Sequence, residues 1–278
     1  MSEIFQSERR CSLKLILWAT LFLPPVAALL LLTPLNQALF MWLNSHLVQW
    51  LGESFWAVFT NLGDGFFLFP LAMVLVIKNP KRQLAMIITI ILAALALNIS
   101  KSIVDAARPF AVLGDAVSVV GPELKSHSTP SGHSGTVFLL AGLGLIYLGK
   151  RGATIAATIA ILTGISRVAV GAHWPADVVL GAWIGLLCSA LGALAAHRLE
   201  AGIKTRAFFI LLGCVAICVL PTYDNGFQDI LSVRILQYSL ALAALVLTVS
   251  ESISFARDLS AKRTQQNAPG RSNIVSGD

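Results

Sequence analysis

The sequence predicts an all-α protein, a polytopic bundle of membrane-spanning helices, and three observations support this fold class. Hydrophobic residues make up 56% of the chain and charged residues only 12%, whereas a soluble domain carries about 25% charged residues. Apolar runs long enough to cross a bilayer recur along the whole chain. The basic residues cluster in alternate connections between these runs, which is typical of a protein that crosses the membrane repeatedly.

Eight apolar runs are predicted to cross the membrane. A spanning helix needs about 20 apolar residues, and a shorter one can serve where flanking polar groups reach the interface. The predicted spans cover, in order, about residues 13–35, 55–77, 84–104, 134–149, 153–172, 176–197, 207–221 and 235–250. Between the first two, residues 36–54 mix Trp42 and Trp50 with polar side chains, which favours a helix that lies in the interface without crossing.

The chain is expected to comprise a six-span core at residues 1–200, two additional spans within 201–255 and a disordered polar tail at 256–278. The first 32 residues begin with basic side chains and continue as a long apolar run that ends at Thr33-Pro34. Because this run lacks a small-residue cleavage pattern, we expect a retained membrane anchor and not a signal peptide.

The net charge of +6 is compatible with nucleic-acid binding, but the positions of the 20 basic residues argue against it. Fifteen of them precede the first span, fill the second, fourth and sixth connections, or lie in the tail. The positive-inside rule places these segments, and with them both termini, in the cytoplasm. The other five are Lys101, Arg108, Lys125, Arg167 and Arg234. The segments around Lys101, Arg108 and Arg167 are therefore predicted to face the extracytoplasmic side.

The four cysteines indicate neither a metal site nor a disulfide framework. Cys214 and Cys218 share a helix face, but no histidine or acidic residue lies near them in the sequence, so we interpret them as small core hydrophobes. The chain also lacks a Gly-rich dinucleotide motif. We expect no metal and no other cofactor.

Lys101 and Arg108-Pro109 form the first of three segments that place cationic or histidine side chains beside apolar runs, where a charge is costly and usually functional. The two cations are seven residues apart, so on a helix that continues through this stretch they point to one side. Arginine offers a planar fork for phosphate oxygens and lysine a compact charge. The alternative is that both side chains extend to lipid headgroups at the interface.

Thr129-Pro130-Ser131-Gly132-His133 is the second segment and has the pattern of a helix start, with Thr129 as N-cap and Pro130 as the first helical residue. The backbone N–H groups of Ser131 and Gly132 would then point at an incoming anion, supported by the helix dipole. His133 follows in the same turn, where it can exchange a proton with a leaving oxygen. A capped helix start without a catalytic role explains the first four residues equally well.

Ser166-Arg167, His173 and Asp177 form the third segment. If Pro175 is the first residue of the sixth span, Asp177 is the third, where an acidic side chain commonly reaches back across the turn and could meet His173. A carboxylate on one ring nitrogen fixes the histidine tautomer and leaves the other nitrogen free to attack. Arg167 would neutralise charge on phosphoryl oxygens. The alternative is an interfacial histidine beside an acidic helix cap.

The three segments, Lys-x6-Arg-Pro, Pro-Ser-Gly-His and Ser-Arg-x5-His-x3-Asp, all lie within residues 101–177. In them the chain resembles the type 2 phosphatidic acid phosphatase family of membrane lipid phosphatases, whose three-part signature it matches without a departure. The six predicted spans at about 13–197 are also similar to that family. The resemblance therefore implies a six-span phosphatase core, and the two spans after residue 200 lie outside it.

The resemblance implies a role for each matching residue. His173 would be the nucleophile that forms a phosphohistidine, Asp177 would orient it, and His133 would protonate the leaving group and then activate water. The residues implied to bind the phosphate are Lys101, Arg108, Ser131, Gly132 and Arg167. The chemistry would need no metal, since these cations stabilise the charge that magnesium handles in kinases. The residues by themselves do not decide which histidine attacks.

We therefore predict an inner-membrane phosphatase, independent of metal, that hydrolyses a lipid phosphate or diphosphate on the extracytoplasmic side. The substrates considered are undecaprenyl diphosphate, phosphatidate, phosphatidylglycerol phosphate and the phosphates of lipid A. The expected partners are this lipid and the bilayer, and the sequence leaves the oligomeric state open. Two alternatives remain: a phosphotransferase that passes the phosphate to a second lipid such as lipid A, and a transporter of anionic lipids without catalysis.

Overall fold

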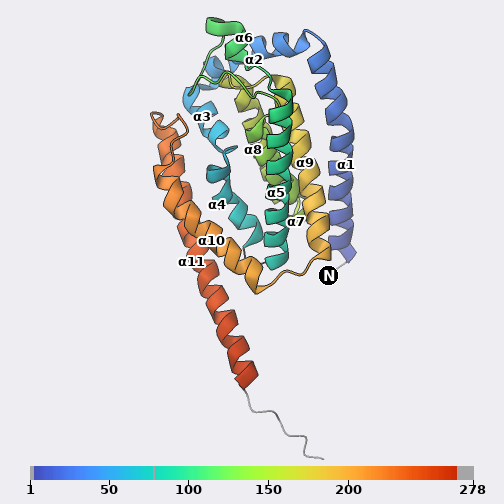
Figure 1. The fold of residues 1–278 in the computed structure, drawn as a ribbon, viewed down its shortest axis with the longest axis vertical. Helices are drawn as coiled ribbons and strands as arrows, with labels where there is room; N and C mark the ends of the chain where they lie inside the picture. Colours follow the sequence, from blue (N-terminus) through green and yellow to red (C-terminus); the bar gives the residue numbers. More distant parts are fainter. Residues whose placement is uncertain (1–2, 78, 268–278) are drawn as a thin grey trace, which may run out of the picture.

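The computed structural model describes residues 3–77 and 79–267, and the regular secondary structure of these residues is entirely helical (Figure 1). The helices are α1 (Glu3–Leu32), α2 (Leu35–Leu51), α3 (Glu53–Asn61), α4 (Gly65–Val76), α5 (Pro80–Val104), α6 (Pro109–Leu113), α7 (Gly132–Tyr147), α8 (Lys150–Ala169), α9 (Pro175–Arg198), α10 (Ile203–Val219) and α11 (Leu231–Asn267). Short 3-10 turns, Gly114–Ala116 and Leu220–Thr222, follow α6 and α10. The predicted all-α fold class is confirmed.

Six helices within residues 3–77 and 79–267 are long and apolar enough to cross a membrane, namely α1, α5, α8, α9, α10 and α11. The helices α3 and α4 pass the same test only together, as a pair bent by 64°, and α7 is apolar but has only 16 residues. A polytopic membrane bundle is therefore confirmed, with six to seven candidate spans where eight were predicted. The predicted second span is a bent pair of helices and the predicted fourth span is the short helix α7.

The bend between α3 and α4 lies at residues 62–64, where the sequence predicted an uninterrupted helix. Asp64 begins α4 as its N-cap, because its Oδ1 accepts a hydrogen bond from Phe66 N at 2.9 Å. Gly63 packs so closely against α7 that a Cβ on this residue would lie 2.7 Å from the Cβ of His133. The glycine and the capping aspartate thus end α3 directly beside the start of α7.

The predicted interfacial helix corresponds to α2, which lies across one end of the bundle (Figure 1). Its Trp42 and Trp50 side chains are exposed, whereas Asn44 is buried. The Asn44 amide donates to the carbonyl oxygens of Ser118 and Ala169 and accepts from Ser118 N, each at 2.9 Å. Because these bonds satisfy the buried amide, Asn44 fixes α2 to the end of α8 and to the loop that precedes α7.

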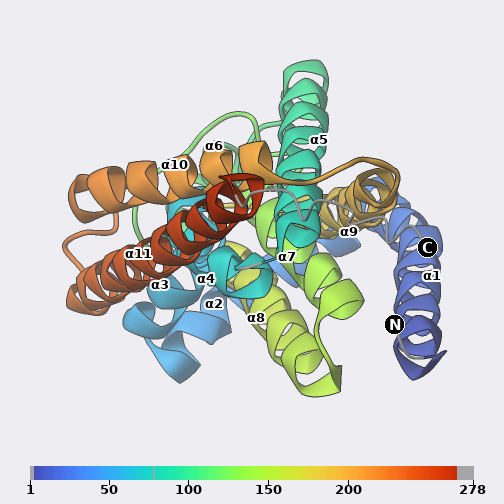
Figure 2. The same ribbon diagram turned by 90° about the horizontal axis from the view of Figure 1, so that it is seen from below.

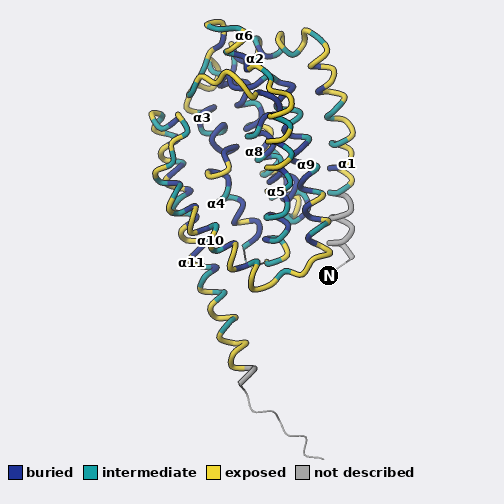
Figure 3. Tube along the Cα trace, viewed as in Figure 1, coloured by how far each residue is buried: buried dark blue, intermediate teal, exposed yellow. Residues whose placement is uncertain are grey.

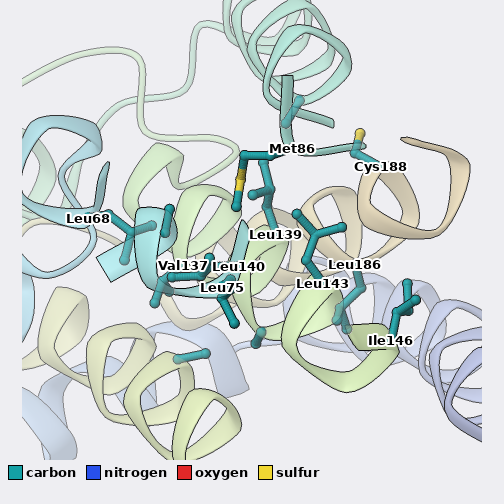
Figure 4. Packing of buried hydrophobic residues seen from close by; sticks show 14 of the residues in the cluster. Leu68, Leu75, Met86, Val137, Leu139, Leu140, Leu143, Ile146, Leu186 and Cys188 are labelled. Carbon is teal, nitrogen blue, oxygen red and sulfur yellow. The ribbon is translucent and has the colours of Figure 1, made fainter. Parts of the chain in front are cut away.

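The helices α7 and α9 pack closely together, and both also contact α1, α5 and α8; the tube in Figure 3 shows α9 among the most buried elements. Glycines allow this close packing, since a Cβ on Gly185 would overlap the carbonyl oxygen of Gly135 and a Cβ on Gly181 would overlap that of Ser131. Figure 4 shows the apolar cluster that α7 and α9 share with α4 and α5. The first turns of α7 and α9 are consequently held against each other.

The helices α10 and α11 lie on the side of the bundle opposite α1 (Figures 1 and 2). Arg206 on α10 donates through Nε to Glu251 Oε1 of α11 at 2.7 Å, and Gln83 Nε2 of α5 donates to the same oxygen at 3.3 Å. Arg206 also pairs with Asp258, so the ion pair holds α11 beyond residue 256. Residues 256–267, expected to be disordered, are therefore helical. Residues 268–278 and Lys78 lie outside the described residues.

The three cysteines whose side chains the structure describes have different surroundings. Cys188 on α9 is buried, whereas Cys214 and Cys218 on α10 are exposed on the outer surface of the bundle. The prediction that Cys214 and Cys218 are small core hydrophobes is thus wrong, because the face of α10 that carries them points away from the bundle.

Candidate active site

The loops that carry the three motif segments lie at one end of the bundle, beside α2 and α6, and the described N-terminal end of α1 and C-terminal end of α11 lie at the other end (Figure 1). Each motif residue stands at or near the end of a helix. Lys101 is near the end of α5, Arg108 precedes α6, Gly132 and His133 begin α7, Arg167 is in the last turn of α8, His173 is in the α8–α9 loop, and Asp177 is in the first turn of α9. The topology therefore gathers residues spread over 101–177.

The first segment differs from its predicted helix. The helix α5 ends at Val104, and Asp105 adopts the left-handed conformation with φ of 34°. Arg108 is extended because Pro109, the first residue of α6, disfavours helix before it. Lys101 and Arg108 thus do not share one helix, yet both turn toward the same place. A Cβ on Gly132 would lie 3.7 Å from Lys101 Nζ.

Arg108 is buried and bonded to the His173 loop, so the alternative in which it extends to lipid headgroups does not hold. Its Nη1 donates to the carbonyl oxygen of Ala172 at 3.0 Å and lies 3.2 Å from Nε2 of His173, and its Nε donates to Ser126 O at 2.7 Å. A guanidinium has only donors. His173 Nε2 is therefore the accepting nitrogen, and the ring proton is assigned to Nδ1.

His173 and Asp177 face each other, each only about 1% exposed. Nδ1 of His173 lies 3.6 Å from Oδ2 of Asp177, slightly longer than a hydrogen bond. The Asp177 carboxylate also accepts from Ser128 Oγ at 2.6 Å, from Trp174 N at 3.0 Å and from Thr129 Oγ1. The bond to Trp174 N is the predicted reach back across the first turn of α9.

Burial of the His173 ring, together with the positive charges of Arg167 and Arg108, lowers its pKa below the usual value although Asp177 opposes the shift. The imidazole is consequently neutral near pH 7. With the proton on Nδ1, the lone pair of Nε2 points toward the arginines. A neutral histidine of this kind is suited to nucleophilic attack on an anionic group that the arginines hold.

Arg167 is buried beside the His173 loop and carries an unpaired donor. Its carbonyl oxygen accepts from the backbone N–H of His173 at 3.1 Å, and its Nη1 donates to Thr60 Oγ1 of α3. Among the residues that the structure describes, Nε of Arg167 has no hydrogen-bond partner. A buried cationic donor without a partner is costly unless a ligand satisfies it. The group is well suited to bind an anion.

The start of α7 differs from the predicted cap. Ser131 is the N-cap, with its Oγ accepting from Ser134 N at 3.3 Å, and Thr129 instead donates to Asp177. The N–H of Ser131 donates to Asp177 O at 2.9 Å, so this amide is not directed at an anion as predicted. The amides of Gly132 and His133 are in the first turn, where a helix offers no acceptor. They remain suited to anion binding.

His133 is half-buried against Gly63 on the first turn of α7. Its imidazole interacts electrostatically with Arg167, His173, Lys101 and Arg108. The structure thus brings both histidines and three cations of the motifs within electrostatic reach of one another. The sequence did not indicate that Ser128 and Thr129 bond to Asp177, or that Thr60 bonds to Arg167. These contacts join residues 48 to 107 positions apart, and nothing in the local sequence indicates them.

The remaining polar residues near this end have other partners. Asp64 caps α4, His127 lies 3.5 Å from the exposed Asp105, and His46 contacts Trp42 on α2. Among the side chains that the structure describes, those of residues 12–77 and 79–264, no cluster of three or more histidine, cysteine or acidic groups forms a metal site.

The fold and the site define a polytopic membrane protein with a buried, cationic, two-histidine site at one end of its bundle. The sequence model of the PAP2 superfamily matches residues 82–201. The crystal structure of Aquifex aeolicus LpxE is 30% identical, superposes with a TM-score of 0.52, and the match covers 58% of this chain and 95% of that one. The chain belongs to the PAP2 superfamily.

Two further relatives are named for their activities. A PAP2-type phosphatidylglycerolphosphate phosphatase from Bacillus subtilis is 25% identical, with a TM-score of 0.52 over 66% of this chain and 97% of that one. An undecaprenyl-diphosphatase of Sulfolobus acidocaldarius is 30% identical over 122 residues, 42% of this chain and 58% of the relative. The matches to curated relatives cover between 16% and 58% of their lengths.

Proposed function

We propose that this protein is an integral membrane phosphatase that releases phosphate from a lipid phosphate or diphosphate through a phosphohistidine at His173. The observation that carries the proposal is the placement of His173, whose Nε2 faces Arg108 at 3.2 Å while Nδ1 faces Asp177 at 3.6 Å. One ring nitrogen is thus directed at an anion site and the other at a carboxylate. Membership of the PAP2 superfamily supports the same reaction class.

In the first step, Nε2 of His173 attacks phosphorus and the bond from phosphorus to the lipid oxygen breaks. The leaving oxygen takes the bond's electron pair and a proton from His133, which acts as an imidazolium because the bound phosphate anion beside it favours the charged ring. In the second step, water attacks phosphorus, His133 accepts its proton, and the phosphorus–nitrogen bond breaks to give inorganic phosphate. Asp177 stabilises the positive charge that the imidazole ring carries in the phosphohistidine.

The phosphoryl oxygens would be held by Lys101, Arg108, Arg167 and the first amides of α7. Arg167 Nε gains the partner that it lacks, and Arg108 exchanges its contact with Nε2 for one with a phosphate oxygen, which frees the nucleophile. Ser131 is fully buried, and its N–H and Oγ are both bonded. We therefore propose that Ser131 positions Gly132 and Asp177 and does not bind the phosphate itself.

We propose further that the site faces the extracytoplasmic side and that both termini are cytoplasmic. The distribution of basic residues supports this orientation, and the site lies at the end of the bundle opposite the described ends of α1 and α11 (Figure 1). A reporter fused to the C-terminus, assayed for cytoplasmic or extracytoplasmic activity, tests the orientation. An extracytoplasmic C-terminus would reverse it.

The activity is tested by measuring free phosphate from undecaprenyl diphosphate, phosphatidate and phosphatidylglycerol phosphate, each given alone in detergent. We expect release from at least one lipid, and loss of release in His173→Ala. His127→Ala is the matched control, because His127 is an exposed histidine at the same end of the bundle. Phosphate release that requires a second acceptor lipid would instead indicate a phosphotransferase, and binding without release would indicate a transporter.

A further inference from the structure

A cavity of about 450 Å³ lies between α4, α5, α7 and α10. Its lining is almost entirely apolar and includes Phe69 of α4, Ile90 of α5, Leu140 of α7 and Leu212 of α10. Two lining side chains of neighbouring helices, Ile90 and Val215, are 39% and 44% exposed, so the cavity opens sideways between α5 and α10. In a membrane this opening faces the hydrocarbon of the bilayer.

The cavity begins about one helical turn from the candidate active site, on the side toward the middle of the bundle. On α7, His133 is followed by Thr136 and Leu140, which line the cavity at helical spacing of three and seven residues. On α5, Ile90 precedes Lys101 by eleven residues, close to three full turns, so the two share a face about 16 Å apart. Asp64, which also lines the cavity, follows Gly63, the residue packed against His133. The helices α5 and α7 thus each carry phosphate-site residues near one end and cavity-lining residues one to three turns away.

The helix α10 forms one wall of the cavity, and the segment that follows it is bonded to the α3–α4 bend beside the cavity. Tyr223, after α10, donates its hydroxyl to Asp64 Oδ2 at 3.0 Å, and Asn225 Nδ2 donates to Asn61 Oδ1 at 2.8 Å. Burial and the charge of Asp64 raise the pKa of Tyr223 to about 12, so the hydroxyl stays protonated as a donor. Arg206 and Glu251 anchor the other end of α10. The wall is therefore held at both ends.

We propose that this cavity binds a hydrocarbon chain of the lipid phosphate, and that α10 contributes the wall that selects for long chains. The inference rests on the proposed function, which supplies the anionic headgroup at Lys101 and His133. A chain attached to that headgroup must leave the site toward the bilayer, and the cavity extends from Thr136, three residues after His133, to the sideways opening. The span α10 lies outside the matched PAP2 segment, residues 82–201, so chain selection would be a property of this chain's own C-terminal helices.

Leu212→Trp fills the cavity, and Leu211→Trp is the matched control because Leu211 is the adjacent residue, 57% exposed, and does not line the cavity. Each variant is assayed on dioleoyl and dihexanoyl phosphatidate, and on undecaprenyl and farnesyl diphosphate. We expect Leu212→Trp to lower kcat/KM by about tenfold or more on the long-chain member of the hydrolysed pair. On the short-chain member it should match Leu211→Trp within about twofold.

A second measurement separates chain binding from catalysis. Native mass spectrometry measures how much of the same long-chain lipids the wild type and both variants retain. If Leu212→Trp does not fold, Ile90→Trp fills the cavity from α5 in its place. Equal long-chain hydrolysis and retention in Leu212→Trp and Leu211→Trp would overturn the chain site while leaving the phosphatase intact. Retention lost only in the cavity-filling variants, with no hydrolysis by wild type, would support the chain site and overturn the proposed function.

Discussion

Asp177→Asn tests the central contact of the candidate site. The substitution keeps the size of the side chain and removes its charge. The amide oxygen can take the place of Oδ2, which accepts from Ser128 and Trp174 N, while Thr129 Oγ1 can turn to accept from the new NH2 group. We therefore expect a folded protein whose His173 has lost its carboxylate partner.

The magnitude follows from the distance between His173 Nδ1 and Asp177 Oδ2. Two unit charges 3.6 Å apart interact by roughly 4.6 kcal/mol at an effective dielectric constant of about 20. In the proposed mechanism this interaction exists when the imidazole is positively charged, in the phosphohistidine and in the transition states that flank it, and not when His173 is neutral. Its loss raises the barrier and should lower kcat by about 10³-fold.

The assay is phosphate release from the preferred lipid, with circular dichroism and thermal unfolding as checks of folding. Asp105→Asn is the control, because Asp105 forms a comparable pair with His127, at 3.5 Å, that is exposed to solvent. An exposed pair contributes little, and asparagine tolerates the left-handed conformation of residue 105. A folded Asp177→Asn protein that keeps kcat within about tenfold of wild type would refute the assignment of Asp177 to His173.

Three further predictions concern charge, pH and packing. Arg167→Ala should lower kcat by about 10²- to 10³-fold, as does the removal of a preorganised donor in other enzymes. Thr60→Val removes the acceptor of Arg167 Nη1 and should lower kcat by a smaller factor. Steady-state kinetics would measure both effects. Because the pKa of His173 is lowered in the folded protein, the unfolded chain binds more protons than the folded protein below about pH 6.5. The unfolding temperature should therefore fall as the pH drops from about 7 to 5, and the His173→Gln substitution should weaken this dependence. Gly185→Ala should destabilise the fold by about 1–3 kcal/mol, because its Cβ would overlap Gly135 O; Gly149→Ala, with nothing within 4 Å, should leave the unfolding temperature nearly unchanged.

The sequence predicted helices well where long apolar runs determine them, and less well where tertiary contacts end a helix. The bend at Gly63 depends on its contact with His133, a residue 70 positions away. The end of α5 before Arg108 had a local signal, since Pro109 disfavours helix in the preceding residue. The helical spacing of Lys101 and Arg108 was therefore the wrong reason for a correct expectation, namely that both cations face one place.

The sequence indicated which residues form the motifs, but it did not indicate which of them caps α7 and which bonds to Asp177. Both Thr129 and Ser131 are good N-cap residues. Asp177 decides between them, because it accepts from the Thr129 hydroxyl and its carbonyl oxygen accepts from Ser131 N. These contacts join segments nearly 50 residues apart, which no local pattern encodes.

The same contacts make the geometry of the site depend on the packing of α7 against α9. Asp177 is held from the α7 side by Ser128, Thr129 and the N–H of Ser131, while its own helix is α9. Gly181, one turn further along α9, packs against the carbonyl oxygen of Ser131. Any side chain at this position would separate the two helices at the point where Asp177 lies near His173 Nδ1. A Gly181→Ala protein should therefore lose activity by more than its loss of stability explains, because a small displacement of α9 lengthens the His173–Asp177 contact before the bundle unfolds.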